Sequence, residues 1–170
     1  MLPDLLAPGL TIVFCGTAAG TASATRGHYY AGPGNRFWPT LAETGLTPRL
    51  FAPEEDYLLP GLGFGLTDLA KSVAGSDRVI PPAAYDPTRL GGLLASYHPR
   101  AVAFTSLKAA RIALGRRHDP GLVAAGEPYG GVQIWVLPSP SGLARGSFRI
   151  APWQALADWH KSYARLGVTP

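Results

Sequence analysis

The sequence predicts an α/β fold in which helices cover both faces of a central sheet. Apolar segments with strand character alternate with segments that have helical spacing and caps. The strand segments are apolar throughout instead of alternating with polar residues, which is typical of a sheet buried on both faces. A chain of 170 residues without an internal repeat or a long linker is expected to form one domain over residues 1–170.

Buried strands are expected where short apolar runs end at glycine, proline or polar residues. Such runs occupy residues 10–15, 101–104 and 132–137, with a shorter extended segment at residues 62–66. In open α/β sheets, ligands bind beyond the carboxyl ends of the strands. We therefore expect functional residues in the loops at residues 16–34, 67–80, 105–107 and 138–148.

Capping residues and the spacing of apolar positions predict four helices. Asn35, Asp86 and Ser106 are typical N-cap residues, and Pro87 suits a first helical turn. The helices are predicted at residues 36–44, 86–97, 106–115 and 151–166. The last one carries an apolar stripe that should face the core, formed by Leu156, Trp159, Tyr163 and Leu166.

Composition excludes several classes of protein. The chain is 46% hydrophobic and 15% charged, and no apolar run reaches the length of about 18 residues that a membrane-spanning helix needs. Asp4 stands where a signal peptide would be basic, so we expect a cytoplasmic protein. The single cysteine, Cys15, and the spacing of the four histidines predict no metal site, and no other cofactor is expected. The net charge of +4 fits contact with a polyanion.

The segment after the first strand, GTAAG at residues 16–20, is built from small residues. It lacks the spacing of a dinucleotide fingerprint and the Lys-Ser/Thr pair of a P-loop. Small residues at a strand end let a flat ligand approach the backbone, whose N–H groups can donate hydrogen bonds. The alternative is a tight turn that only permits close packing.

Two other loops carry residues suited to nucleic acid. Tyr29 and Tyr30 precede a Gly/Pro turn, where an aromatic ring can stack on a nucleobase, unless both are core or surface side chains. The segment LPSPSGLARG, residues 137–146, is stiffened by two prolines and places Leu143 beside Arg145. Such a loop can push into a duplex and hold its backbone, unless Leu143 turns back into the core.

The segments LAPGLTIVFCG, NRFW and VQIWVLPSPSGLAR, in this order and spacing, resemble the mismatch-specific uracil-DNA glycosylases of the thymine/uracil-DNA glycosylase family. The resemblance implies a three-layer α/β/α sandwich around a short, mainly parallel central sheet. It also implies a monomeric DNA repair glycosylase that flips a nucleotide and hydrolyses the N-glycosidic bond of uracil, especially opposite guanine. Double-stranded DNA with a uracil mismatch would be its partner, with single-stranded DNA as a further candidate.

The resemblance also assigns roles to residues of two loops. Tyr30 would stack on the flipped base beside Gly16, Ala18 and Gly20, and Ser23 would lie near the pocket edge where a thymine methyl group would be. Leu143 would fill the space that the flipped nucleotide leaves, and the backbone of residues 142–144 would meet the orphaned guanine. DNA contacts are expected from Ser139, Ser141, Gly142, Leu143, Ala144 and Arg145.

The sequence departs from the family at both motifs. The first motif of the family usually reads Gly-Ile-Asn-Pro-Gly, and its Asn positions the attacking water. Here Ala18 and Ala19 occupy the Asn and Pro positions. The second motif usually opens with Asn, where this chain has Ser139. Because both family Asn residues are absent, the resemblance does not identify the catalytic residue.

A carboxylate suits the missing role because glycosidic cleavage develops positive charge on the sugar. Asp68 alone among the carboxylates directly follows an extended apolar segment that should end near residues 16–20. Asp68 is therefore the first candidate catalytic residue, and Thr17, whose hydroxyl could hold water, is the second. The alternative is that Asp68 caps a helix at residues 69–72. No lysine is well placed for lyase chemistry, and Lys71 is the nearest.

Two further functions stay open at the level of the sequence. A non-catalytic binder of flipped or damaged bases would keep Tyr30 and Leu143 but give Asp68 no role. A small-molecule nucleotide hydrolase with the same pocket would have no use for Leu143.

Overall fold

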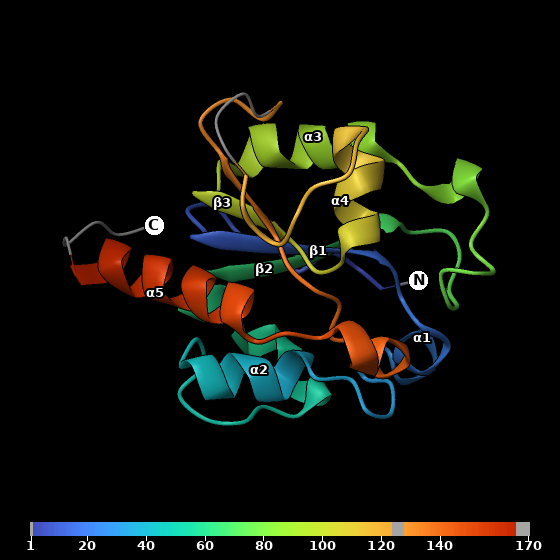
Figure 1. The fold of residues 1–170 in the computed structure, drawn as a ribbon, viewed down its shortest axis with the longest axis horizontal. Coiled ribbons are helices and arrows are strands. Elements are labelled where there is room, and N and C mark those ends of the chain that lie inside the picture. The colour runs from blue at the N-terminus through green and yellow to red at the C-terminus, as the bar shows by residue number, and fades with distance from the viewer. Residues whose placement is uncertain (1, 124–127, 166–170) are drawn as a thin grey trace.

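The computed structural model describes residues 2–123 and 128–165, without the side chains of residues 145, 164 and 165. Within these ranges, five strands form one sheet in the order β2-β1-β3-β5-β4 (Figure 1). β2, β1, β3 and β5 run parallel, and β4 is antiparallel to β5. The strands are β1 (Ile12–Ala18), β2 (Phe64–Ala70), β3 (Ala101–Phe104), β4 (Gly121–Leu122) and β5 (Gln133–Val136).

Helices lie on both faces of the sheet (Figure 1). One layer contains α1 (Thr21–Arg26), α2 (Phe37–Thr44) and α5 (Ala151–Arg165), and the other contains α3 (Pro87–Tyr97) and α4 (Leu107–Leu114). Successive residues of β1 face opposite layers, because Phe14 packs in the cluster that includes Trp153 of α5, whereas Cys15 packs in the cluster that includes Leu90 of α3. The predicted three-layer α/β/α sandwich with a mainly parallel sheet is confirmed.

The predicted caps are present at two helices. The Asp86 carboxylate accepts from the Arg89 N–H (3.0 Å), and the Ser106 hydroxyl accepts from the Ala109 N–H (3.0 Å). The predicted cap at α2 is wrong, because Arg36 is the N-cap residue there, although the Asn35 side-chain oxygen accepts from the Phe37 N–H (2.9 Å). Of the predicted apolar stripe on the last helix, Leu156 is fully buried and Trp159 packs against the same core. Leu166 lies outside the described residues.

Several predicted boundaries are wrong. β1 continues to residue 18 and β2 to residue 70, so residues 16–18 and 67–70 are strand and not loop. The predicted loop at residues 16–34 contains α1, and the loop at residues 138–148 contains a 3-10 helix, Gly142–Ser147. Other short 3-10 helices, Pro53–Leu58, Pro60–Leu62 and Pro82–Ala84, and the strand β4 were also not predicted. These elements are short or poor in β-forming residues, so tertiary pairing determines them more than local sequence does.

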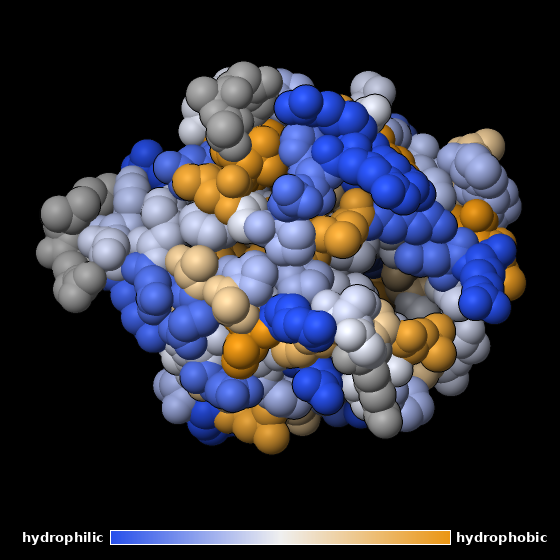
Figure 2. Space-filling model, in the orientation of Figure 1, coloured by the Kyte–Doolittle hydropathy of each residue, from blue (hydrophilic) through white to orange (hydrophobic). Residues whose placement is uncertain are grey.

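No helix among the described residues is long and apolar enough to cross a lipid bilayer. On the face of the molecule shown in Figure 2, hydrophobic side chains form separate small patches between hydrophilic ones. Leu143 is the most exposed of the large hydrophobic side chains described, with 87% of its surface accessible.

Candidate active site

Three neighbouring strands bring residues of distant sequence together at the carboxyl edge of the sheet. Gly16 of β1 lies opposite Asp68 of β2 in the strand register, and the Thr105 N–H, just after β3, donates to the carbonyl of Cys15 (3.0 Å). Phe14, Leu66 and Ala103, two residues earlier in each segment, all pack on the layer of α2 and α5. Because side chains alternate along a strand, Asp68 and Thr105 face this same layer, on either side of Gly16.

The missing side chain of Gly16 makes room for this arrangement. A Cβ atom at position 16 would lie 2.7 Å from Asp68 Oδ1, and 3.3 Å from both Thr105 Oγ1 and the Tyr30 hydroxyl. The first distance is too short for any side chain without displacement of the carboxylate. A glycine at this position therefore allows three oxygen atoms to converge on the end of β1.

Asp68 is a buried carboxylate with 5% of its surface accessible. No hydrogen bond or ion pair reaches its side chain within residues 2–123 and 128–165. Lys71 and Arg89, the cations whose charges act on Asp68, both pair with Asp4 instead. Burial raises the pKa of Asp68 from 3.8 to about 6, with a further rise from the Asp4 charge and an opposing effect of Lys71 and Arg89. Asp68 is thus mainly ionised at neutral pH, as a general base must be.

The structure corrects two expectations about Asp68. It does not follow an extended segment but lies inside β2, and it does not cap a helix at residues 69–72, because residues 69 and 70 belong to the same strand. Thr17 is the next residue after Gly16, so its side chain points to the other face of the sheet. Its hydroxyl donates to the Asp77 carboxylate (2.8 Å). The structure therefore brings Asp68, and not Thr17, beside Tyr30.

The Tyr30 hydroxyl lies next to Gly16 and Thr105. Its ring stacks on Phe37 of α2, with the ring centroids 3.9 Å apart, and its hydroxyl shares a hydrogen bond with Thr105 Oγ1 (2.9 Å). Burial, and the charge of Asp68, raise the pKa of the Tyr30 hydroxyl well above its ordinary value, so the phenol stays neutral. The backbone of Tyr30 has a φ of +54°, a left-handed conformation that costs roughly 1–3 kcal/mol in a non-glycine residue.

Other residues predicted for the base pocket have different surroundings. Ser23 is buried, and its hydroxyl accepts from the Ala31 N–H (2.9 Å). Ser23 therefore contacts the loop at residues 27–36 that carries Tyr30 (the Tyr30 loop). Ala18 pairs with Ala70 in the sheet, and Gly20 is the residue before α1. Residues 2–123 and 128–165 contain no group of three or more His, Cys, Asp or Glu side chains that could hold a metal ion.

The loop at residues 139–144 is braced against the Tyr30 loop. The Arg36 N–H donates to the carbonyl of Pro140 (2.8 Å), and a Cβ on Gly142 would lie only 2.6 Å from the carbonyl oxygen of Pro33. The Ser141 hydroxyl accepts from the Leu143 N–H (3.2 Å), and Ser139 accepts from the Ser141 N–H (3.2 Å). This bracing leaves Leu143 exposed, so the alternative in which Leu143 returns to the core is wrong. The Arg145 side chain lies outside the described part of the chain.

A cavity of about 740 Å³ opens beside Tyr30, between α1, α2 and residues 50–55. Tyr30 lines this cavity, whereas Gly16, Asp68 and Thr105 do not. Sequence reasoning missed Thr105 and Phe37. Thr105 carried a usable signal, since it is the first polar residue after an apolar strand, whereas nothing local indicates that Phe37 supports Tyr30.

Comparison with known proteins agrees with this architecture. The chain is similar in fold to the solution NMR structure of a "putative Uracil DNA glycosylase" from Methanosarcina acetivorans, with a TM-score of 0.66 over 94% of this chain and 96% of that one, at 21% sequence identity. The sequence model of the uracil DNA glycosylase superfamily matches residues 3–161. Since this match spans nearly the whole chain, the protein belongs to the uracil DNA glycosylase superfamily.

Proposed function

We propose that the chain is a monofunctional glycosylase that hydrolyses uracil from DNA, especially opposite guanine, and that it belongs to the mismatch-specific branch. Membership of the superfamily supports a DNA glycosylase function. The observation that carries the proposal is the Asp68 carboxylate, which is buried and unpartnered among the described residues beside Gly16 and Tyr30. An unpaired buried charge destabilises the fold, so its presence calls for a functional explanation.

In this proposal Asp68 takes over the role of the family Asn that Ala18 has replaced. Cleavage of the glycosidic bond develops positive charge on deoxyribose and negative charge on the departing uracil. Ionised Asp68 would orient the attacking water or offset the sugar charge. Backbone N–H groups between Thr17 and Gly20 would donate to the uracil anion.

DNA binding would use Tyr30 and Leu143. Phe37 stacks on one face of the Tyr30 ring, and a flipped base would stack on the other. Leu143 would enter the gap in the duplex, and its exposure favours a DNA substrate over a free nucleotide. Lys71 donates to the Tyr29 hydroxyl (3.0 Å) and pairs with Asp4 (3.2 Å), so its amine is engaged, which supports hydrolysis without lyase chemistry.

A glycosylase assay with a labelled G·U duplex tests the proposal. We expect abasic sites that become strand breaks only after alkali, and faster release from G·U than from A·U pairs. Tight binding without excision would instead identify a non-catalytic binder of flipped bases. Hydrolysis of free deoxyuridine nucleotides without action on DNA would identify a nucleotide hydrolase, and either result would overturn the proposal.

A further inference from the structure

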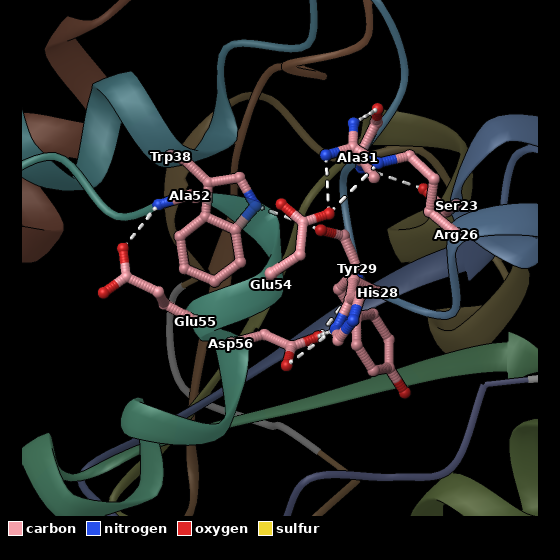
Figure 3. Close-up of polar contacts among 10 residues, drawn as sticks. All are labelled: Ser23, Arg26, His28, Tyr29, Ala31, Trp38, Ala52, Glu54, Glu55 and Asp56. Carbon is pink, nitrogen blue, oxygen red and sulfur yellow. Dashed lines mark hydrogen bonds and ion pairs between the residues drawn. The ribbon is translucent and has the colours of Figure 1, made fainter.

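The loop that carries Tyr30 is held by side chains from separate parts of the chain (Figure 3). Before Tyr30, the Asp56 carboxylate accepts from the Tyr29 N–H (3.2 Å), and the indole N–H of Trp38 donates to the Tyr29 carbonyl (3.0 Å). After Tyr30, Ser23 accepts from the Ala31 N–H (2.9 Å), and Arg26 donates to the Ala31 carbonyl (2.8 Å). The backbone donor and acceptor of both neighbours of Tyr30 are therefore bonded to side chains.

Asp56 is the most deeply placed acid of this arrangement. Only 6% of its surface is accessible, and both of its oxygens also lie 3.2 Å from Nδ1 of His28. The reaction proposed above gives Asp56 no role. Its oxygen is instead the hydrogen-bond acceptor for a backbone N–H that directly precedes the left-handed residue Tyr30.

The two acids that precede Asp56 on the same 3-10 helix offer a graded comparison. Glu54 reaches the Tyr30 loop only through another residue. It pairs with Arg26 (2.6 Å), and Arg26 donates to the Ala31 carbonyl. Glu55 bonds Arg49 and the Ala52 N–H, and among the described residues it makes no hydrogen bond or ion pair with residues 29–31. Three consecutive carboxylates thus differ both in burial and in how directly they reach the Tyr30 loop.

We propose that Asp56 is a positioning residue that holds Tyr30 in its left-handed conformation and so keeps the Tyr30 ring on Phe37, ready for a base. The inference rests on the proposed function through the stacking role of Tyr30. Without Asp56, the Tyr29 N–H loses its partner, and Tyr30 can relax toward a negative φ that removes its ring from Phe37 and Thr105.

Single-turnover excision from a G·U duplex tests this role in three variants. Asp56→Ala should lower the maximal rate by about tenfold or more, because the flipped base loses the positioned Tyr30 ring. Asp56→Asn keeps an acceptor for Tyr29 and should recover most of the loss. Glu55→Ala is the matched control and should retain the parent rate. Equal losses in Asp56→Ala and Glu55→Ala would overturn the proposal.

The double variant Tyr30→Ala/Asp56→Ala separates positioning from general stability. If Asp56 acts through Tyr30, the second substitution adds no further loss of rate to Tyr30→Ala. Multiplicative losses would show that Asp56 acts independently of Tyr30 and would contradict the proposal.

Amide hydrogen exchange in the free protein tests the same claim without any activity. Asp56→Ala should speed exchange at Tyr29 and Ala31 while the amides of β1 stay protected, and Glu55→Ala should change neither. Unchanged exchange at residues 29–31, or a uniform increase over the whole chain, would refute the positioning role. If the parent excises no uracil, the proposed function fails, but this exchange result still decides how Asp56 acts on the loop.

Discussion

Asp68 and Leu143 depart from the usual match between residue type and environment in opposite directions. Asp68 is a carboxylate with 5% of its surface accessible, and Leu143 is an aliphatic side chain with 87% accessible. A buried charge without a partner destabilises the fold, whereas an exposed leucine stabilises nothing. Folding explains neither residue, so each is a candidate for contact with a ligand.

The two regions differ in how the surrounding structure holds each residue in place. Asp68 belongs to a row of residues on three paired strands, where displacement of one atom disturbs the others. Leu143 lies in the 3-10 helix Gly142–Ser147, which is braced at its start by contacts with Ser141 and Pro33, and its side chain is exposed. Changes near Asp68 should therefore affect the chemical step on any substrate, and changes at Leu143 should affect only substrates whose base pair must be opened.

The largest effect is expected from Asp68→Asn. This substitution keeps the shape of the side chain and removes its charge. Single-turnover excision of uracil should fall at least about a hundredfold, within the range typical of acid–base catalysis. Duplex affinity, measured by fluorescence anisotropy, should remain near that of the parent, and a parallel loss of affinity would indicate that Asp68 contributes mainly to binding.

The same variant should be more stable than the parent at neutral pH. An acid whose pKa is higher in the folded chain than in the unfolded chain lowers stability as pH rises from 3.8 to about 6, and the loss is complete above pH 6. Asp68→Asn should therefore raise the free energy of unfolding at pH 7.5 by about 2–3 kcal/mol. Denaturant unfolding at pH 7.5 and near pH 4.5 measures this, and the gain should shrink at the lower pH. A less stable variant at pH 7.5 would contradict the structure of the site.

Gly16→Ala tests whether the placement of Asp68 matters as well as its charge. The added methyl group would meet Asp68 Oδ1 at 2.7 Å and must displace it. A displacement of about 1 Å can lower a rate by about a hundredfold, so excision should fall by about tenfold to a hundredfold. Gly91→Ala in α3, where an added Cβ meets nothing within 4 Å, is the control. Parent activity in Gly16→Ala would show that the carboxylate is not confined.

The smallest effect, and the most selective, is expected from Leu143→Ala. Excision from a G·U duplex should fall about tenfold, because no side chain fills the opened stack, and excision from single strands should change much less. The free energy of unfolding should stay within about 0.5 kcal/mol of the parent value, as is usual for exposed residues. Equal losses on both substrates would show that Leu143 does not act as a wedge.

The sequence was sufficient for the parts of the fold that local chemistry determines. Apolar runs located β3 and β5, and the side chains of Asp86 and Ser106 located the starts of α3 and α4. The last residues of β1 were missed because glycine and alanine have low strand propensity, and pairing with β2 extends the strand there. The local sequence therefore predicts which segments form strands and helices better than it predicts the residues at which they end.

The candidate site was predictable only in part. Asp68 could be selected because carboxylates near strand ends are few, although it lies inside β2. The left-handed backbone of Tyr30 and its hydrogen bond to Thr105, 75 residues away, arise from tertiary contacts that leave no local pattern. The bracing of the Tyr30 loop by Asp56 is of the same kind.

The pH dependence of single-turnover excision tests the catalytic role of Asp68 most directly. Uracil release from a G·U duplex is measured for the parent and for Asp68→Asn between about pH 5 and about pH 8, with enzyme in excess. In the proposed mechanism the ionised carboxylate is the active form, so the parent rate should rise with pH through the pKa of about 6 and then level off. Asp68→Asn should be slow throughout and should lack this rise. A variant that keeps both the parent rate and the rise near pH 6 would contradict a catalytic role for Asp68.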